Sequence, residues 1–264
     1  MIGNRVELAP GYRTCVRDEG AGDPVVLLPE VPLDLRSWDG VVPLLTRRGM
    51  RVIRCDPRGF GSASDATLEF SYPRLAKDVV ALLDHLGIGR AQVVGHAFGG
   101  QVALTLARWF PQRVSAGSLV CTTVDPCMAA GRLERRLRSQ GRPDVERLVH
   151  EWLGQSAART SYEAWYLREQ VLTADLRAWR QALSAMSRFD MHADLTSIHL
   201  PMRFVAAARD PDAPPSDVRK VAMLLPHGEF LLAAGEGHML PVVAPSLTAR
   251  LIVGAGASVA TRAA

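Results

Sequence analysis

The segment AQVVGHAFGGQVALTLARWF, residues 91–110, constrains the fold more than any other part of the chain. It begins with a short apolar run typical of a buried strand and continues with small and apolar residues up to Pro111, which would stop a helix. A strand that runs directly into a helix needs a sharp turn, here centred on Ala97, whose backbone is forced toward strained angles. Gly95 and Gly99 flank that turn and would let the backbones pass closely. We therefore expect a strand–turn–helix unit at the carboxyl edge of a sheet.

Short apolar runs alternate with helical patterns in the first half of the chain and again near its end. Leu75, Val79, Leu82 and Leu86 are spaced as one face of a helix, which Gly87 is suited to end. Such alternation favours a parallel sheet. The sequence therefore predicts an α/β fold with a mostly parallel sheet covered by helices on both faces. The predicted strands are residues 25–28, 51–55, 91–95, 114–121, 201–208 and 229–234, and a last helix is predicted from about Pro241 to Val253.

The alternation stops between residues 127 and 188, where the pattern indicates three or four helices and no strand. We therefore predict a core made of residues 1–126 and 189–264, interrupted by a helical cap, or lid, at 127–188. The small and polar residues 254–264 are expected to form a frayed end.

The composition and charge of the chain mainly exclude classes of function, such as binding to nucleic acid or to a membrane. The net charge of +4 comes from scattered arginines, and the densest group, residues 132–142, is interpreted as a solvated helix face. A nucleic-acid site would interleave such charges with aromatic residues, and none do. No apolar run reaches the roughly 18 residues of a membrane span, and the first residues form no secretory leader. We expect a cytoplasmic protein that acts on a small molecule and binds neither nucleic acid nor membrane, with its oligomeric state left open.

The cysteines and glycines point to no cofactor. The four cysteines form no C-x-x-C pair and no metal-ligand spacing with the histidines, so free thiols in a reducing compartment are expected. GFGSAS, residues 59–64, lacks the lysine and the spacing of a phosphate-binding loop. We therefore predict that the protein uses neither a metal nor an organic cofactor.

The turn around Ala97 matches the pattern G-x-S-x-G-G of a nucleophile elbow except at its central residue. Alanine has no nucleophilic atom, so the chain as given cannot form an acyl-enzyme. The side chain of residue 97 would still point into the cavity above the sheet. The N–H of Phe98, an unpaired donor in the first turn of the helix, would face the same space.

Two polar residues follow consecutive predicted strands near the end of the chain. Asp210 comes after residues 201–208, and His238 comes after 229–234. In this order we expect His238 to act as general acid and base with a pKa near neutrality. Asp210 would orient the imidazole and stabilise its charged form. Asp212 is the competing candidate for the acid.

With these residues in place, the chain resembles the α/β-hydrolase superfamily along essentially its whole length. It is most similar to the capped branch that includes 3-oxoadipate enol-lactone hydrolases and small bacterial esterases. The resemblance implies that a serine attacks an ester or lactone carbonyl beneath the cap, and that Trp152, Trp165, Tyr166 and Met239 line the substrate pocket. The matching segments are PLDLRSWDGVVPLL, RCDPRGFGSA, LAKDVVALLDHLGI, VVGHAFGG, MSRFDMHADLTSIHLPMRFVAAARDPDAPP and AAGEGHML.

The chain departs from this family at a second place, after the strand at residues 25–28. Where the family has His-Gly or a close variant, this chain has Pro29-Glu30-Val31. The N–H of Val31 would be the second oxyanion-hole donor beside that of Phe98, and a carboxylate nearby would oppose developing negative charge. Glu30 either points outward into solvent or is an acid or base in a remodelled site.

Three hypotheses follow. In the first, His238 and Asp210, with Glu30, carry out acid–base chemistry such as elimination, cyclisation or isomerisation on a bulky apolar carbonyl compound. By analogy, this enzyme would belong to a bacterial biosynthetic pathway. In the second, a serine ester or lactone hydrolase had its nucleophile replaced by Ala97 in the laboratory. In the third, the protein is a non-catalytic binding module. The retained His238 and Asp210 argue against the third.

Overall fold

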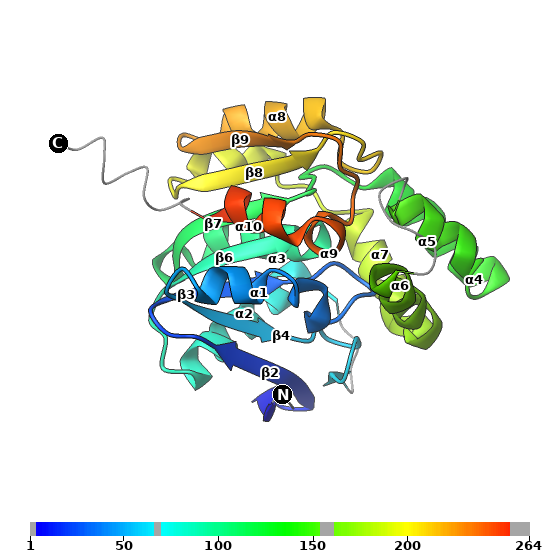
Figure 1. Ribbon diagram of the computed structural model, residues 1–264, viewed down its shortest axis with the longest axis horizontal. Coiled ribbons are helices and arrows are strands. Elements are labelled where there is room, and N and C mark those ends of the chain that lie inside the picture. The colour runs from blue at the N-terminus through cyan, green and yellow to red at the C-terminus, as the bar shows by residue number, and fades with distance from the viewer. Residues whose placement is uncertain (1–3, 66–69, 154–160, 254–264) are drawn as a thin grey trace.

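The computed structural model describes residues 4–65, 70–153 and 161–253, and the predicted frayed end at 254–264 lies outside them. Nine strands form one sheet with the order β1-β2-β4-β3-β6-β7-β8-β9, and β5 pairs with β2 (Figure 1). The ladder from β4 to β9 is parallel throughout, as the alternation of strands and helices predicts. The strands are β1 (Asn4–Ala9), β2 (Tyr12–Glu19), β3 (Asp23–Leu28), β4 (Met50–Cys55), β5 (Ser64–Asp65), β6 (Ala91–His96), β7 (Val114–Val120), β8 (Met202–Ala207) and β9 (Gly228–Ala233).

The antiparallel strands at the N-terminal edge were not predicted from the sequence. β1 and β2 pair with each other, and β2 continues the sheet against β4. Along β2 buried positions alternate with more exposed ones, so the strand carries arginine, aspartate and glutamate beside its apolar residues. Continuous apolar runs indicate strands that are buried on both faces. A half-buried strand of this kind has no such run and therefore gives no such signal.

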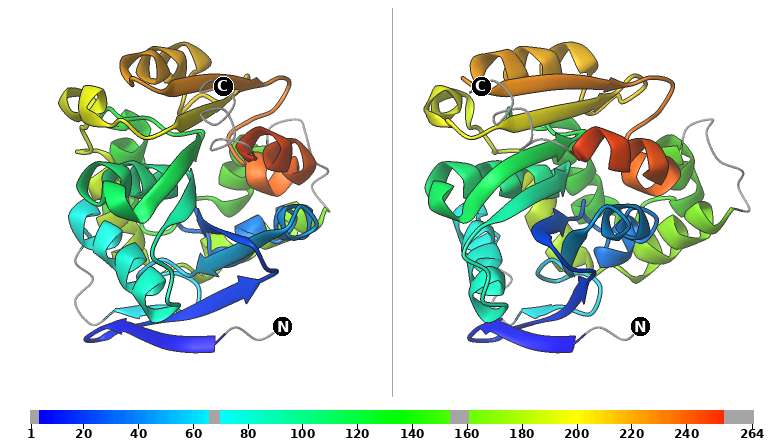
Figure 2. Two further views of the ribbon diagram at one scale, coloured as in Figure 1. Left: turned by 90° about the vertical axis from the view of Figure 1, so that its left-hand side faces the viewer. Right: turned by 60° about the vertical axis from the view of Figure 1, so that its left-hand side comes forward.

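Helices cover both faces of the sheet, as predicted (Figure 2). Along β3, Val26 and Leu28 pack into the core beneath α2, α3 and α8, whereas Val25 and Leu27 face the core beneath α1 and α10. Neighbouring side chains of a strand point to opposite faces, so a strand buried on both sides must be apolar throughout. The helices are α1 (Val42–Thr46), α2 (Tyr72–His85), α3 (Phe98–Trp109), α4 (Met128–Gln140), α5 (Val145–Leu153), α6 (Tyr162–Thr173), α7 (Leu176–Met186), α8 (Pro215–Leu224), α9 (Leu240–Val243) and α10 (Pro245–Ile252).

Two helix ends follow from single residues. Gly87 has φ of 66° just beyond α2, a left-handed conformation that glycine adopts without strain, as predicted. The helix predicted from Pro241 to Val253 is wrong in one respect, because it is broken into α9 and α10. Pro245 begins the second helix and disfavours a helical conformation at Ala244, which has φ of −135° and ψ of 56°.

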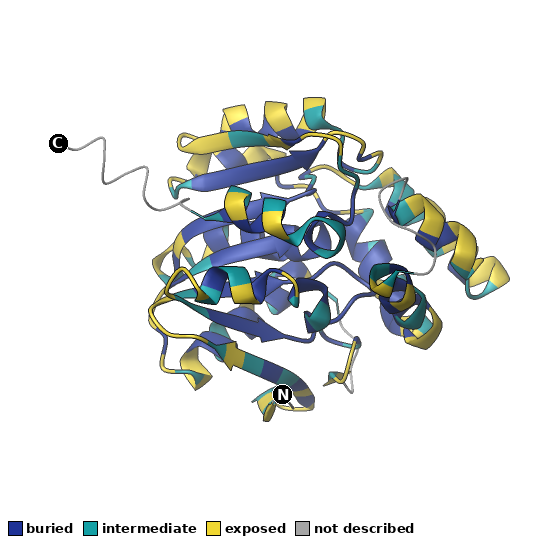
Figure 3. Cartoon of the chain, viewed as in Figure 1, coloured by how far each residue is buried: buried dark blue, intermediate teal, exposed yellow. Residues whose placement is uncertain are grey.

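The segment predicted to be a helical insertion contains α4, α5, α6 and α7, which lie together beside the sheet (Figure 1). Their outward faces are largely exposed, whereas the central strands of the sheet, to their left in this view, are mostly buried (Figure 3). α4 packs against α7, and α5 against α6. Within the described part of the chain, no helix is both long and apolar enough to cross a membrane.

Candidate active site

The turn between β6 and α3 has the strained geometry expected from the sequence. Ala97 has φ of 45° and ψ of −104°, and its N–H donates to the carbonyl of Val120 at 2.9 Å. A Cβ added at Gly95 would lie 2.2 Å from the carbonyl oxygen of Gly99, and one added at Gly99 would lie 2.3 Å from that of Leu28. Only glycine permits these approaches, so the small residues fix the turn at the carboxyl edge of the sheet.

His238 and Asp210 meet in the loops after β9 and β8. His238 Nδ1–H donates to Asp210 Oδ2 at 2.8 Å, and both side chains are buried. The other carboxylate oxygen, Oδ1, accepts the backbone N–H groups of Asp212 and Ala213. Of the two candidate acids, Asp210 is therefore the one bonded to His238, while Asp212 lies at the cavity wall.

The two charges of this pair stabilise each other. Burial tends to lower the pKa of His238, but the charge and hydrogen bond of Asp210 outweigh it and raise the pKa to about 10. Burial likewise tends to raise the pKa of Asp210, which His238 instead lowers to about 2. The imidazolium–carboxylate pair is thus the resting form at neutral pH, in contrast to the near-neutral pKa that the sequence analysis assigned to His238.

Glu30 points inward, which answers the question left open by the sequence. Its side chain is buried, and Oε2 accepts the N–H of Phe98 at 2.7 Å. The backbone N–H of Val31 lies near enough to favour the charged form of this carboxylate. Of the two donors expected to bind a substrate oxyanion, the N–H of Phe98 is therefore bonded to Glu30, and that of Val31 lies beside the same carboxylate. The outward, solvated orientation is excluded for this side chain.

Burial is the main influence on the pKa of Glu30. It raises the pKa of Glu30 from 4.5 to about 7, against the opposing effects of the His238 charge and of the two backbone N–H groups. Loss of water penalises the charged carboxylate more than these partners favour it. Near pH 7 the group therefore exists in both protonation states, as proton transfer requires.

A cavity of about 380 Å³ lies over these groups, within the usual size range of ligand sites. Glu30, Val31, Ala97 and His238 line it, and much of the remaining wall comes from α4, α5 and α7. The apolar lining residues include Leu133, Leu148, Trp152, Trp179, Leu183, Met186 and Met239.

Two of the residues expected in the pocket wall lie elsewhere. Trp152 and Met239 line the cavity, but Trp165 does not and is 53% exposed. Tyr166 is buried, yet its ring packs away from the cavity and its hydroxyl donates to Asp34 Oδ1 at 3.1 Å. Polar and apolar residues are mixed around α6 and form no distinct apolar face, so the sequence could not indicate whether an aromatic ring of this helix faces the cavity.

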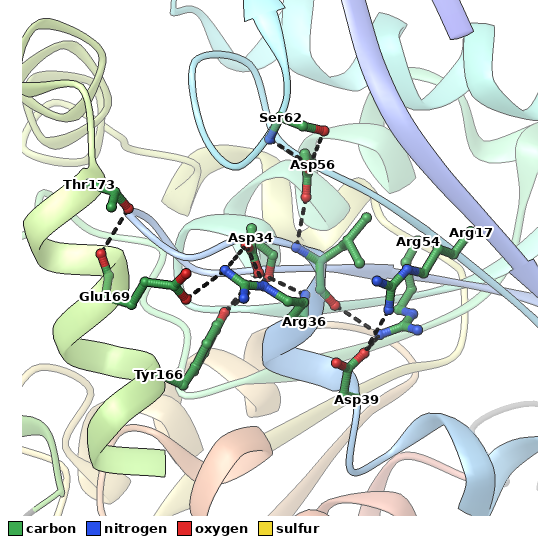
Figure 4. Close-up of polar contacts among 11 residues, drawn as sticks. Arg17, Asp34, Arg36, Asp39, Arg54, Asp56, Ser62, Tyr166, Glu169 and Thr173 are labelled. Atoms are coloured by element: carbon green, nitrogen blue, oxygen red, sulfur yellow. Dashed lines mark hydrogen bonds and ion pairs between the residues drawn. The ribbon is translucent and has the colours of Figure 1, made fainter. Parts of the chain in front are cut away.

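Tyr166 belongs to a set of contacts that joins α6 to the loop after β3 (Figure 4). Arg36 bonds Asp34 at 2.8 Å and Glu169 of α6 at 2.9 Å, and its guanidinium lies over the Tyr166 ring. We call Asp34, Arg36, Tyr166 and Glu169 the α6 latch. The latch begins four residues after Glu30 and holds the same loop against the insertion.

Three cavity residues on the helices were not predicted from the sequence. They are Gln101 of α3 and, on α4, Arg132 and Arg136. The arginines are four residues apart and so lie on one helix face, a spacing that could have identified them. Interpreting residues 132–142 only as a solvated face was therefore incomplete.

Two groups of side chains near the cavity have metal-ligating atoms within 4.8 Å of one another. One is His96, Cys121 and His238, and the other is Asp210, Asp212 and His238. Both require His238, whose Nδ1 is committed to Asp210. Burial also raises the pKa of Cys121 well above its usual value, which disfavours the thiolate that binds metals. Neither arrangement is suited to a metal ion.

Comparison with known proteins agrees with this architecture. The alpha/beta hydrolase fold family matches residues 23–140. "Putative carbamate hydrolase RutD" of Caulobacter sp. (strain K31) is 32% identical over 206 residues, 74% of this chain and 76% of that protein. Bifunctional epoxide hydrolase 2 of Sus scrofa is 34% identical over 123 residues, which span only 22% of its length.

Solved structures match nearly the whole chain. A thermophilic esterase from Thermogutta terrifontis has a TM-score of 0.85 and 26% identity, and the match covers 94% of this chain and 96% of that one. The enol-lactonase of Burkholderia xenovorans LB400 has a TM-score of 0.84 and 21% identity over 96% of this chain and 99% of its own, a likeness of fold alone.

Proposed function

Because the chain belongs to the alpha/beta hydrolase fold family, whose members compared above include hydrolase enzymes, we propose that it is an enzyme with an altered use of the family's site. In this proposal no covalent intermediate forms at residue 97. Glu30 and His238 instead transfer protons in an elimination, cyclisation or isomerisation of a bulky apolar carbonyl compound. The carboxylate of Glu30 bonded to the N–H of Phe98 carries the proposal.

The occupied donors argue against ordinary ester hydrolysis. Acyl transfer needs the N–H groups of Phe98 and Val31 free to stabilise a tetrahedral oxyanion. Glu30 accepts the N–H of Phe98 and lies beside that of Val31, and a second negative charge at that place would repel the first. Restoring a serine alone would therefore leave the oxyanion without its donors.

The protonation states of Glu30 and His238 support a role as base for the first and as acid for the second. Near pH 7, the ionised fraction of Glu30 is a base within an apolar cavity. It retains lone pairs beyond the one used by the N–H of Phe98 and can remove a proton from a carbon next to a carbonyl group. His238, held as imidazolium by Asp210, donates its Nε2–H to the carbonyl oxygen or leaving group. Residues 127–188 act in this proposal as the lid that excludes water.

The acid–base role can be tested without the natural substrate. 5-Nitrobenzisoxazole opens when a base removes its ring proton, and the phenolate product absorbs visible light. We expect the wild type to accelerate this reaction with a rate that rises through about pH 7. Glu30→Gln should lower it by roughly 10²-fold, the scale of general-base catalysis. Glu151→Gln changes another, half-exposed carboxylate of the same cavity and is the matched control. Equal rates for wild type and Glu30→Gln would contradict the proposal.

A second comparison separates this proposal from that of a serine hydrolase with a replaced nucleophile. Ala97→Ser alone should give no acyl-enzyme burst with p-nitrophenyl butyrate, because Glu30 still bonds Phe98. The double variant Ala97→Ser with Glu30→Gly frees the donors and should give the burst. A burst from Ala97→Ser alone would instead support a hydrolase that lacks only its serine oxygen.

A further inference from the structure

Two arginines stand at the outer part of the cavity. Arg132 and Arg136 of α4 both line it, and both are exposed. Among the described residues, neither forms an ion pair. Their acidic neighbours have other partners, because Glu134 bonds Arg180 at 3.3 Å and Glu151 bonds Arg147 at 2.9 Å.

The cavity therefore has polar groups both in its buried part and at its exposed part. Glu30 and His238 are buried at its floor, whereas Arg132 and Arg136 are exposed at its mouth. Much of the remaining wall is apolar, with Trp152 and Trp179 its largest residues. A ligand that fills this space would be apolar along its length and polar at each end.

We propose that the substrate carries a carboxylate at the end remote from the reacting carbonyl, and that Arg132 and Arg136 bind it. Guanidinium groups form paired, charge-assisted hydrogen bonds with planar carboxylates. A singly charged group suits the cavity better than a phosphate dianion, since Glu151 and Asp212 also line it and would repel the larger charge. This assignment of a substrate class rests on the proposed function of the same cavity.

Binding of two matched probes tests the assignment. 6-Phenylhexanoate and 6-phenylhexanamide have nearly the same shape and differ in charge, and titration calorimetry at pH 7.5 in low salt gives their affinities. We expect the wild type to bind the acid about tenfold more tightly than the amide, the scale of one charged contact near a surface. Arg132→Gln with Arg136→Gln should abolish this preference and leave the affinity for the amide unchanged.

Two other arginines of α4 provide the control. Arg135 and Arg138 are exposed and do not line the cavity, so Arg135→Gln with Arg138→Gln removes the same net charge from the same helix. This variant should keep the preference for the acid. Equal affinities of the wild type for acid and amide, or an equal loss of preference in both double variants, would overturn the proposal.

The binding assay and the catalytic assay can refute their two proposals separately. If the wild type prefers the acid but Glu30→Gln opens 5-nitrobenzisoxazole as fast as the wild type does, the acid–base function is overturned and the anion site is retained. A protein that shows the Glu30-dependent rate but no preference for the acid would overturn the substrate class alone.

Discussion

Replacing Glu30 with glutamine should make the protein more stable, and increasingly so as the pH rises. Glutamine has nearly the same shape and can still accept the N–H of Phe98, but it never ionises. In the wild type, burial raises the pKa of Glu30 from 4.5 to about 7. At roughly 1.4 kcal/mol for each pKa unit, ionisation of this carboxyl in the folded protein costs about 3 kcal/mol of unfolding free energy.

The sign of this pH dependence follows from how many protons the folded and unfolded states bind. Between about pH 4.5 and pH 7 the folded protein keeps the proton of Glu30, whereas the unfolded chain has released it. Because the folded state binds more protons, stability falls as the pH rises through this range and then levels off. The contribution is fully present below the unfolded pKa and is lost above the folded one. The glutamine variant has no such loss.

Urea denaturation, followed by tryptophan fluorescence at several pH values from 5 to 8.5, measures the effect. The unfolding free energy of Glu30→Gln minus that of the wild type should grow by about 3 kcal/mol across this range. Titrations of all other groups largely cancel in the difference. Glu151→Gln, the same chemical change at a half-exposed position, is the control. A difference that stays constant within about 1 kcal/mol would refute the burial of an ionisable Glu30.

Three further outcomes are expected. Ala97→Gly should raise the unfolding free energy by about 1 kcal/mol in urea titrations, because relief of backbone strain at φ of 45° outweighs the added entropy of the unfolded chain. A lower unfolding free energy would mean that the turn is unstrained. Asp210→Asn should shift the proton NMR titration of His238 well below the pKa of about 10, because it removes the charge that sustains the imidazolium; an unchanged midpoint would point to another partner. Asp78→Ala removes the carboxylate that bonds the buried guanidinium of Arg58 at 2.5 and 2.6 Å and should cost about 3 kcal/mol of stability. A loss below about 1 kcal/mol would show that water reaches the pair.

The turn at Ala97 and the placement of Asp210 and His238 after consecutive strands could be predicted because each depends on local rules. Glycine spacing sets the turn, and strand ends set the loops. The orientation of Glu30 could not be predicted, since a loop side chain has no periodicity to indicate which way it points. Whether a ring of α6 faces the cavity likewise depends on packing between helices, so the prediction that Trp165 and Tyr166 line the pocket was wrong.

The α6 latch holds α6 against the segment that follows β3. Asp34 and Arg36, a few residues after Glu30 in that segment, are bonded to Tyr166 and Glu169 of α6. Local unfolding of that helix would break these contacts and remove one support of the loop. In the proposed function, Glu30 is the base, and the α6 latch links the loop that carries it to a helix outside the sheet.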